Sequence, residues 1–147
     1  NNFYDKYIAM ANCIFSNNST LAGHISVGDY VVLAGMTAVH QFCMIGNHAF
    51  VTGGSLVRKD VPPFVKAARE PLSYVGINSV GLRRRGYTSE QIREIQSIYR
   101  ILYQKNYNNT QAAQIIEAEL EATPERDEIL QFIKDSKRGI MKGYFQN

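Results

Sequence analysis

Residues 21–57 decide the fold, and they read LAGHISVGDYVVLAGMTAVHQFCMIGNHAFVTGGSLV. An aliphatic side chain recurs every six residues in this stretch without a gap, at Leu21, Val27, Leu33, Val39, Ile45, Val51 and Val57. A second column of small or β-branched side chains lies four residues further on, at Ile25, Val31, Thr37, Cys43, Ala49, Ser55 and Val61, with Ser19 four residues after Phe15. A helix would show a period of about 3.6 and a single strand a period of 2. The six-residue period predicts short strands that turn around a three-sided prism, with three hexads in each coil.

The six-residue pattern fades toward the N-terminus. Phe15 fits the aliphatic column well, Ala9 weakly and Phe3 acceptably. We therefore expect stacked coils over residues 1–63, with residues 1–11 irregular. Because a terminal coil leaves an unpaired strand ladder, a cap, a further coil or a partner has to cover this end.

The pattern stops at Asp60-Val61-Pro62-Pro63, where two prolines remove backbone donors and resist continuation of a ladder. We expect a linker over residues 64–87 and a small helical domain over residues 88–147. Within the prism, small residues directly after the aliphatic positions, such as Gly28 and Gly46, are interpreted as the turns between sides.

The last third of the chain has helical periodicity. Thr88-Ser89-Glu90-Gln91 reads as a capping box, and one apolar face follows it at Ile92, Ile95, Tyr99 and Leu102. A second helix is predicted over Gln111–Ala122. A third is predicted to begin at Pro124 after a Thr123 cap and to bury Ile129, Phe132 and Ile133. Residues 142–147 are expected to be loose.

Composition excludes several classes of function. A net charge of +3 without a dense basic stripe argues against nucleic-acid binding. The chain has no run of roughly 20 apolar residues and no signal-peptide pattern, so we expect a cytoplasmic protein without a membrane span. Cys13 and Cys43 are too few and too far apart for a metal cluster or a disulfide framework, and we expect both to be reduced core residues.

Four motifs add a narrower signal: Leu21-Ala22-Gly23-His24, the run from Gly35 to Phe42 with its His40-Gln41, Gly76-Ile77-Asn78, and Gly81-Leu82-Arg83-Arg84-Arg85-Gly86. In this order, from about Asn12 to near the C-terminus, the sequence resembles the UDP-N-acetylglucosamine O-acyltransferases of lipid A biosynthesis. The resemblance implies a left-handed parallel β-helix followed by a helical domain, assembled as a homotrimer with active sites between subunits. The implied reaction, the first step of lipid A synthesis, transfers a 3-hydroxyacyl or similar chain from acyl carrier protein to the 3-hydroxyl of UDP-N-acetylglucosamine, without a cofactor.

The resemblance also assigns the general base of this reaction. In the family a histidine takes the proton from the sugar hydroxyl, because imidazole titrates near working pH. That position is Asp5 here, beside Lys6. A carboxylate with a pKa of about 4 is a weak base for a hydroxyl, and a neighbouring cation lowers that pKa further. We therefore expect a truncated or variant enzyme with impaired acyl transfer.

Further site residues are carried over from the family's motifs. His24, supporting catalysis, matches a residue beside the reacting sugar, and His40 and Gln41 match a substrate-binding run. Asn78, Arg84 and Arg85 match positions that contact the nucleotide sugar, and planar guanidinium groups suit a diphosphate. Gly53 matches the acyl-chain groove. Without the resemblance, the residues in the repeats are interpreted as solvated corners of the prism and the arginines as a solvated basic turn. Gly53 is then interpreted as a glycine that only relieves crowding.

The same sequence features allow alternative interpretations of the function. A non-catalytic trimeric binding or scaffold module uses the same repeats, and so does a zinc lyase of the carbonic anhydrase kind, which would need His24, His40 and His48 to converge across subunits. The N-acyltransferase that acts one acylation later in the pathway is not expected to carry the triple arginine. A surface with four cations, Arg58, Lys59, Lys66 and Arg69, is a hypothetical docking site for the acidic acyl carrier protein.

Overall fold

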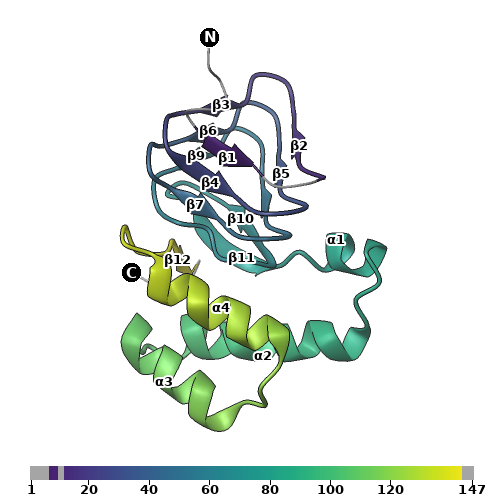
Figure 1. Ribbon diagram of the computed structural model, residues 1–147, viewed down its shortest axis with the longest axis vertical. Coiled ribbons are helices and arrows are strands. Elements are labelled where there is room, and N and C mark those ends of the chain that lie inside the picture. The colour runs from purple at the N-terminus through teal and green to yellow at the C-terminus, as the bar shows by residue number, and fades with distance from the viewer. Residues whose placement is uncertain (1–6, 10–11, 144–147) are drawn as a thin grey trace.

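The first half of the chain forms the prism that the repeat predicts. The computed structural model describes residues 7–9 and 12–143. Its short strands stack in parallel into three faces (Figure 1). The first face holds β1 (Tyr7–Ala9), β4 (Ile25–Val27) and β7 (Met44–Ile45); the second holds β2 (Ile14–Phe15), β5 (Val32–Leu33) and β8 (Phe50–Val51); the third holds β3 (Thr20–Leu21), β6 (Ala38–Val39) and β9 (Leu56–Val57). Pairs such as Phe15↔Leu33 and Val39↔Val57 confirm the register of three hexads per coil.

The two predicted columns line the interior of the prism. Val27, Leu33, Val39, Ile45, Val51 and Val57 are at most 3 % exposed. The second column is also buried from Ile25 to Val61, including the hydroxyl of Thr37, which donates to the Ala34 carbonyl at 2.7 Å. Leu21, in the first coils, is only half-buried. Burial of these side chains is the main contribution to the stability of the prism. Each coil contacts only the coils next to it, so this stability comes from contacts between neighbouring coils.

The corners of the prism lie at a different hexad position from the predicted one. A residue with positive φ recurs every six residues, at Asn12, Asn18, His24, Tyr30, Met36, Phe42, His48 and Gly54. Gly28 and Gly46, interpreted above as turns, are required for close approach instead. A Cβ on Gly46 would come within 2.5 Å of the Pro63 backbone nitrogen. The chain therefore turns on mostly non-glycine residues in the left-handed region.

Two predictions at the ends of the prism are corrected. Within the N-terminal segment expected to be irregular, Tyr7–Ala9 form β1, paired in parallel with β4. The expected linker 64–87 contains β10 (Val65–Ala68), β11 (Ser73–Ile77) and α1 (Ser79–Arg84). The ladder continues past the prolines, because β10 pairs in parallel with β8 at Lys66↔Phe50. Pro62 and Pro63 fall between the Val61 bridge and β10, so their missing donors interrupt no ladder bond.

The helices follow the predicted capping signals. The Thr88 capping box is confirmed at the start of α2 (Ser89–Gln104), and Thr123 caps α4 (Pro124–Asp135). The predicted second helix is shifted: α3 spans Asn109–Glu119 because a second capping box at Asn108 starts it earlier. Within the segment expected to be loose, β12 (Lys142–Gly143) pairs with β11, whereas residues 144–147 lie outside the described residues.

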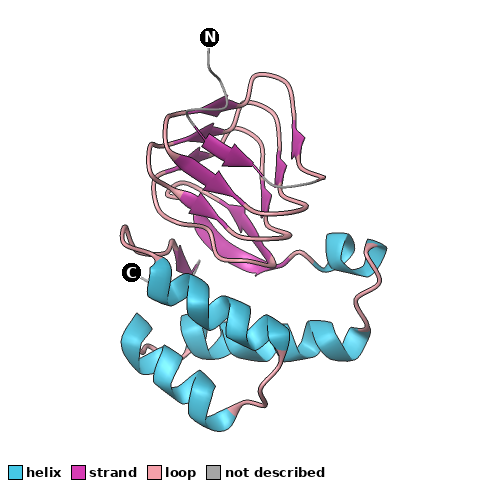
Figure 2. Cartoon of the chain, in the orientation of Figure 1, coloured by secondary structure: helices cyan, strands magenta, loops and turns pink. Residues whose placement is uncertain are grey.

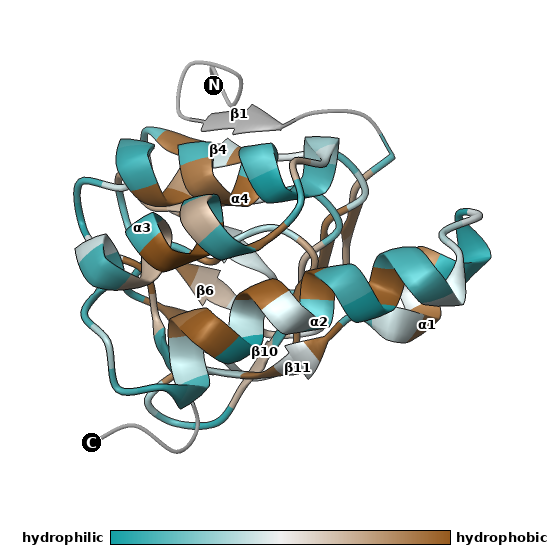
Figure 3. Cartoon of the chain, turned by 90° about the horizontal axis from the view of Figure 1, so that it is seen from below, coloured by the Kyte–Doolittle hydropathy of each residue, from teal (hydrophilic) through white to brown (hydrophobic). Residues whose placement is uncertain are grey.

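Helices α2, α3 and α4 close the end of the prism that its last coil forms (Figure 2). Seen from that end, α2, α3 and α4 are banded in apolar and polar stripes (Figure 3). Tyr99 is fully buried, and its hydroxyl donates to the Pro63 carbonyl. Tyr74, Tyr99 and Tyr103 stack on one another between β11 and α2. No helix in the part of the chain that the structure describes is long and apolar enough to cross a membrane.

Candidate functional site

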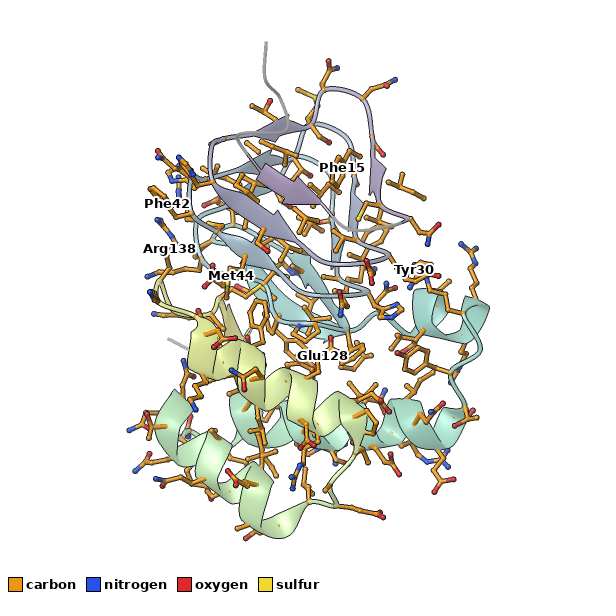
Figure 4. The ribbon with its side chains drawn as sticks, viewed as in Figure 1. Phe15, Tyr30, Phe42, Met44, Glu128 and Arg138 are labelled. Carbon is orange, nitrogen blue, oxygen red and sulfur yellow. The ribbon has the colours of Figure 1, made fainter. Side chains whose placement is uncertain are left out.

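The residues carried over from the family motifs fall on three different edges of the prism. Each edge takes its name from two stacked corner residues: the His24–Phe42 edge, the Tyr30–His48 edge and the Met36–Gly54 edge. Phe42 and Tyr30 lie on opposite sides of the prism (Figure 4). One chain therefore does not bring all of these residues together. Asp5, at the expected base position, lies outside the described residues.

The His24–Phe42 edge carries His24, His40 and Gln41, all exposed. The ring of His24 stacks on the ring of Phe42 with centroids 5.2 Å apart and planes 9° apart. His40 and Gln41 directly precede Phe42 in the chain. The edge thus exposes two imidazoles and an amide, which are groups that can both donate and accept hydrogen bonds.

Arg138 braces this edge from the C-terminal part of the chain. Its Nη1 donates to the Gln41 carbonyl at 3.2 Å, and its Nε and Nη2 donate to the Arg58 carbonyl at 3.2 and 3.1 Å. Lys59 in turn donates to the Arg138 carbonyl at 2.9 Å. Nearby, the buried Asp60 accepts from the Met44 backbone at 2.8 Å and from the Ser136 hydroxyl. These bonds tie the segment after α4 to two adjacent coils.

Asn78 and Arg85 lie at the Tyr30–His48 edge, and both make contacts within the chain. Asn78 is buried and caps α1: its Oδ1 accepts from the Gly81 nitrogen at 3.2 Å, and its Nδ2 donates to the His48 carbonyl at 2.9 Å. Arg85 places its guanidinium carbon 4.9 Å from the centre of the Tyr30 ring. Arg84 is exposed on α1. The structural role of Asn78 was not evident from the sequence.

His48 is the centre of this edge. Its ring stacks between Tyr30 (5.2 Å, 6°) and Phe64 (5.7 Å, 17°), with Tyr87 edge-on at 5.3 Å. Its Nδ1 lies 3.0 Å from Nη1 of Arg85, and its Nε2 lies 3.4 Å from the Tyr87 hydroxyl. Burial, and then the positive charge of Arg85, lower the pKa of His48 from 6.5 to about 4, against the opposing charge of Asp29. The imidazole is therefore neutral at physiological pH.

The Met36–Gly54 edge carries Gly53, directly before the corner residue Gly54. Gly53 is exposed, and a Cβ there would come 3.2 Å from the Gly35 carbonyl oxygen, so coil spacing alone explains a small residue. His48 lies on a different edge from His24 and His40, which means that the three histidines do not converge within one chain. In the described part of the chain, no three His, Cys, Asp or Glu residues are grouped to hold a metal ion.

The hypothetical docking cations are partly engaged within the chain. Arg58 pairs with Glu70 at 3.5 Å, and both side chains are largely exposed. Lys59 binds the Arg138 carbonyl, and the Lys66 ammonium lies 5.9 Å from the centre of the Phe50 ring. The Arg58–Glu70 pair is exposed, and pairs of this kind contribute little to stability.

Sequence reasoning missed the aromatic partners of the site. Tyr30, Phe42 and Tyr87 were not selected, and Arg138 and the bond between His48 and Arg85 were not anticipated. The signal for the stacks was present, because Tyr30 and His48, like His24 and Phe42, are one coil apart in a column with positive φ. No comparable signal in the sequence indicates that Arg85 or Arg138 reaches back to a coil.

Residues 60–141 match the sequence model of the family described as Udp N-acetylglucosamine O-acyltransferase, domain 2. The acyl-[acyl-carrier-protein]--UDP-N-acetylglucosamine O-acyltransferase of Stenotrophomonas maltophilia is 42 % identical over 131 residues, which cover 88 % of this chain and 50 % of that protein. The chain thus spans about half the length of the curated relatives it matches.

Solved structures give the same result. The UDP-N-acetylglucosamine acyltransferase of Bacteroides fragilis superposes with a TM-score of 0.91 at 40 % identity, covering 92 % of this chain and 53 % of that one. The corresponding structure from Acinetobacter baumannii has a TM-score of 0.89 at 33 % identity, covering 93 % of this chain and 54 % of that one. These similarities establish that the parallel β-helix is left-handed. The six-residue period does not determine the handedness.

Proposed function

The chain belongs to the UDP-N-acetylglucosamine O-acyltransferase family, and on this premise we propose that it binds UDP-N-acetylglucosamine and takes part in acyl transfer to it. The donor is an acyl carrier protein loaded with a 3-hydroxyacyl or similar chain, and the acceptor is the 3-hydroxyl of the sugar. The reaction would be the first step of lipid A biosynthesis and would take place in the cytoplasm.

One observation carries this proposal: the polar groups suited to the sugar and those suited to the diphosphate lie on different edges of one prism. His24, His40 and Gln41 are on one edge and Arg85 is on another. Two copies that meet edge to edge would bring both sets to one cleft. We therefore propose a homotrimer, in which each of three clefts is completed by a neighbouring subunit.

The proposed roles follow from the chemistry of the side chains. A ring nitrogen of His24 bonds a substrate oxygen near the reacting hydroxyl, and Gln41 donates to and accepts from the sugar amide or the thioester region. Arg84 and Arg85 bind the diphosphate through their planar donors. Gly53 leaves room for an apolar chain on the cleft wall. Asp5 takes the place of the base, so we propose that transfer is slow.

The first experiment measures binding of UDP-N-acetylglucosamine by isothermal titration calorimetry. Gln41→Ala and Arg84→Ala are expected to weaken binding by about tenfold each, the loss of one charged or well-placed hydrogen bond. Lys105→Ala, an exposed cation at the end of α2, is the matched control and is expected to leave affinity unchanged. No measurable binding by the unaltered chain would contradict the proposal.

The second experiment tests the base. Asp5→His is expected to raise the rate of acyl transfer from 3-hydroxyacyl carrier protein by about two orders of magnitude, the lower part of the range for general-base catalysis. Asp5→Asn is the control, because it removes the charge without supplying a base.

A second candidate function rests on Asp5 itself. A non-catalytic trimeric module would keep the prism and dispense with the base. Nucleotide-sugar binding together with no gain of transfer in Asp5→His would favour this alternative.

We further propose that acyl carrier protein approaches over Arg58, Lys59, Lys66 and Arg69. Reversing the charge with Arg58→Glu and Lys59→Glu is expected to weaken binding of the acidic carrier protein at low salt and to have little effect at high salt. Lys105→Glu controls for net charge. Equal binding by the two sets of variants would refute the docking surface.

A further inference from the structure

The hydrogen bonds of His48 determine its protonation state. The Arg85 guanidinium can only donate, so the Nδ1 atom that it meets at 3.0 Å must accept. The single proton of the neutral ring then sits on Nε2, which faces the Tyr87 hydroxyl at 3.4 Å. A protonated ring would place a second positive charge against Arg85 and would have no acceptor for it. The pair is therefore stable only with one tautomer of the neutral imidazole.

The same contacts orient Arg85. Nη1 is bound to His48, Nη2 donates to the Tyr30 carbonyl at 3.4 Å, and the guanidinium lies over the Tyr30 ring. Within the described part of the chain these bonds use two of the five N–H donors of the arginine. A flexible side chain is thereby held in one orientation, with donors left for a ligand.

We propose that His48 is a positioning residue that holds Arg85 ready for the diphosphate of the nucleotide sugar. The inference rests on the proposed function, because it gives Arg85 a phosphate ligand. The aromatic column Tyr30, His48 and Phe64 keeps the imidazole in place, and Asn78 fixes its backbone through the bond to the His48 carbonyl at 2.9 Å. Ordering Arg85 before binding reduces the entropy lost when the ligand arrives.

Histidine is the residue that meets all the requirements at this corner. With φ of 64°, the position favours residues that tolerate the left-handed region. Phenylalanine would stack, and Tyr30, Phe42 and Phe64 show that other aromatic residues in this chain adopt positive φ, but phenylalanine accepts no hydrogen bond. Asparagine tolerates this conformation and accepts a bond, but it does not stack. These two substitutions therefore separate the acceptor from the stack.

The test is a double-mutant cycle on affinity for UDP-N-acetylglucosamine, measured by titration calorimetry on the full chain. Arg85→Met is expected to weaken binding about thirtyfold and His48→Phe about tenfold. In the Arg85→Met background, His48→Phe is expected to add less than about twofold, because a positioning residue acts only through its partner. His48→Asn restores an acceptor and is expected to bind within about threefold of the unaltered chain.

Tyr87→Phe is a second, milder variant in case His48→Phe folds poorly. It keeps the ring against His48 and removes only the hydroxyl that holds the tautomer, so a loss of about twofold to fivefold is expected. Independent, additive effects of His48→Phe and Arg85→Met would overturn the inference and leave the proposed function standing. So would unchanged affinity in both His48→Phe and Tyr87→Phe. Failure of the unaltered chain to bind the nucleotide sugar would overturn both.

Discussion

Arg138 reaches from the segment after α4 to the backbone carbonyl of Gln41, 97 residues earlier, and donates a hydrogen bond of 3.2 Å to it. With its two bonds to Arg58, the same guanidinium bridges two corners of successive coils. The helical part of the chain thus supports an edge of the prism that carries three of the proposed site residues. Stability of the helices and order of that edge are therefore linked.

Arg138→Met is predicted to lower the free energy of unfolding by about 1 kcal/mol, because charge-assisted bonds to backbone carbonyls are lost from a partly exposed position. Amide hydrogen exchange around Phe42 should also accelerate. Lys137→Met, an exposed neighbour, is the matched control. Urea unfolding curves that coincide for the two variants would show that the bridge contributes nothing.

Gly46→Ala is predicted to destabilise the prism by about 2 kcal/mol or more. The added Cβ would meet the backbone of Pro63 at 2.5 Å, and a backbone cannot move aside as a side chain can. Gly35→Ala is the control, since its Cβ would find only the Asn17 carbonyl oxygen at 3.6 Å. There a neutral or slightly stabilising effect is expected, from the smaller conformational entropy of the unfolded chain. Equal melting temperatures would contradict the assignment of Gly46 to close coil packing.

Met36 is one of the corner residues with positive φ, so substitutions there test the backbone conformation of the corners. It has φ of 60° and is 70 % exposed, so its side chain matters less than its backbone. Met36→Asn is predicted to raise stability by about 0.5 kcal/mol, and Met36→Val to lower it by about 1–2 kcal/mol, because a β-branched residue is strained at positive φ. Chemical denaturation measures both. A stabilising valine would rule out backbone conformation as the dominant effect.

The pKa of His48 predicts a pH dependence of stability. The pKa falls from 6.5 to about 4 in the folded chain, so the unfolded chain binds more protons between these values. The stability contributed by the neutral ring is fully present above about pH 6.5 and is lost as the pH falls through about 4. His48→Phe should remove this slope, as seen in unfolding curves recorded between these pH values.

Glu128 is the internal reference for that measurement. Burial raises the pKa of its carboxyl, so protonation of Glu128 favours the folded chain as the pH falls, which is the opposite sign. Glu128 accepts a hydrogen bond from Asn47, and His48 is not among the groups that shift its pKa, so His48→Phe is expected to leave its environment unchanged. The difference between the two chains therefore isolates His48, and a slope that persists in the variant would assign the effect to another group.

The prism, its register and the starts of α2 and α4 follow from the amino-acid sequence alone, whereas α1 and the start of α3 do not. Val27 and Ile45 belong to a column that can be recognised in the sequence. Each short strand of the prism must place one apolar side chain in the interior, and this local requirement repeats every six residues. The Thr88 and Thr123 caps are readable for the same reason, since a cap is satisfied within one turn. The family motifs likewise indicate His24, His40, Gln41 and Arg85 as candidate site residues.

Which of these residues lie together is evident only once the chain is folded. Three features depend on how the coils stack. They are the positive φ of the corner residues His24 and His48, the continuation of the ladder through β10, and the separation of the candidate site residues onto different edges. The bonds from Arg85 to His48 and from Arg138 to Gln41 join residues distant in sequence, and a single polar contact leaves no periodic trace. Positions that are buried at a regular spacing produce a periodic sequence pattern, whereas one hydrogen bond between distant segments produces none.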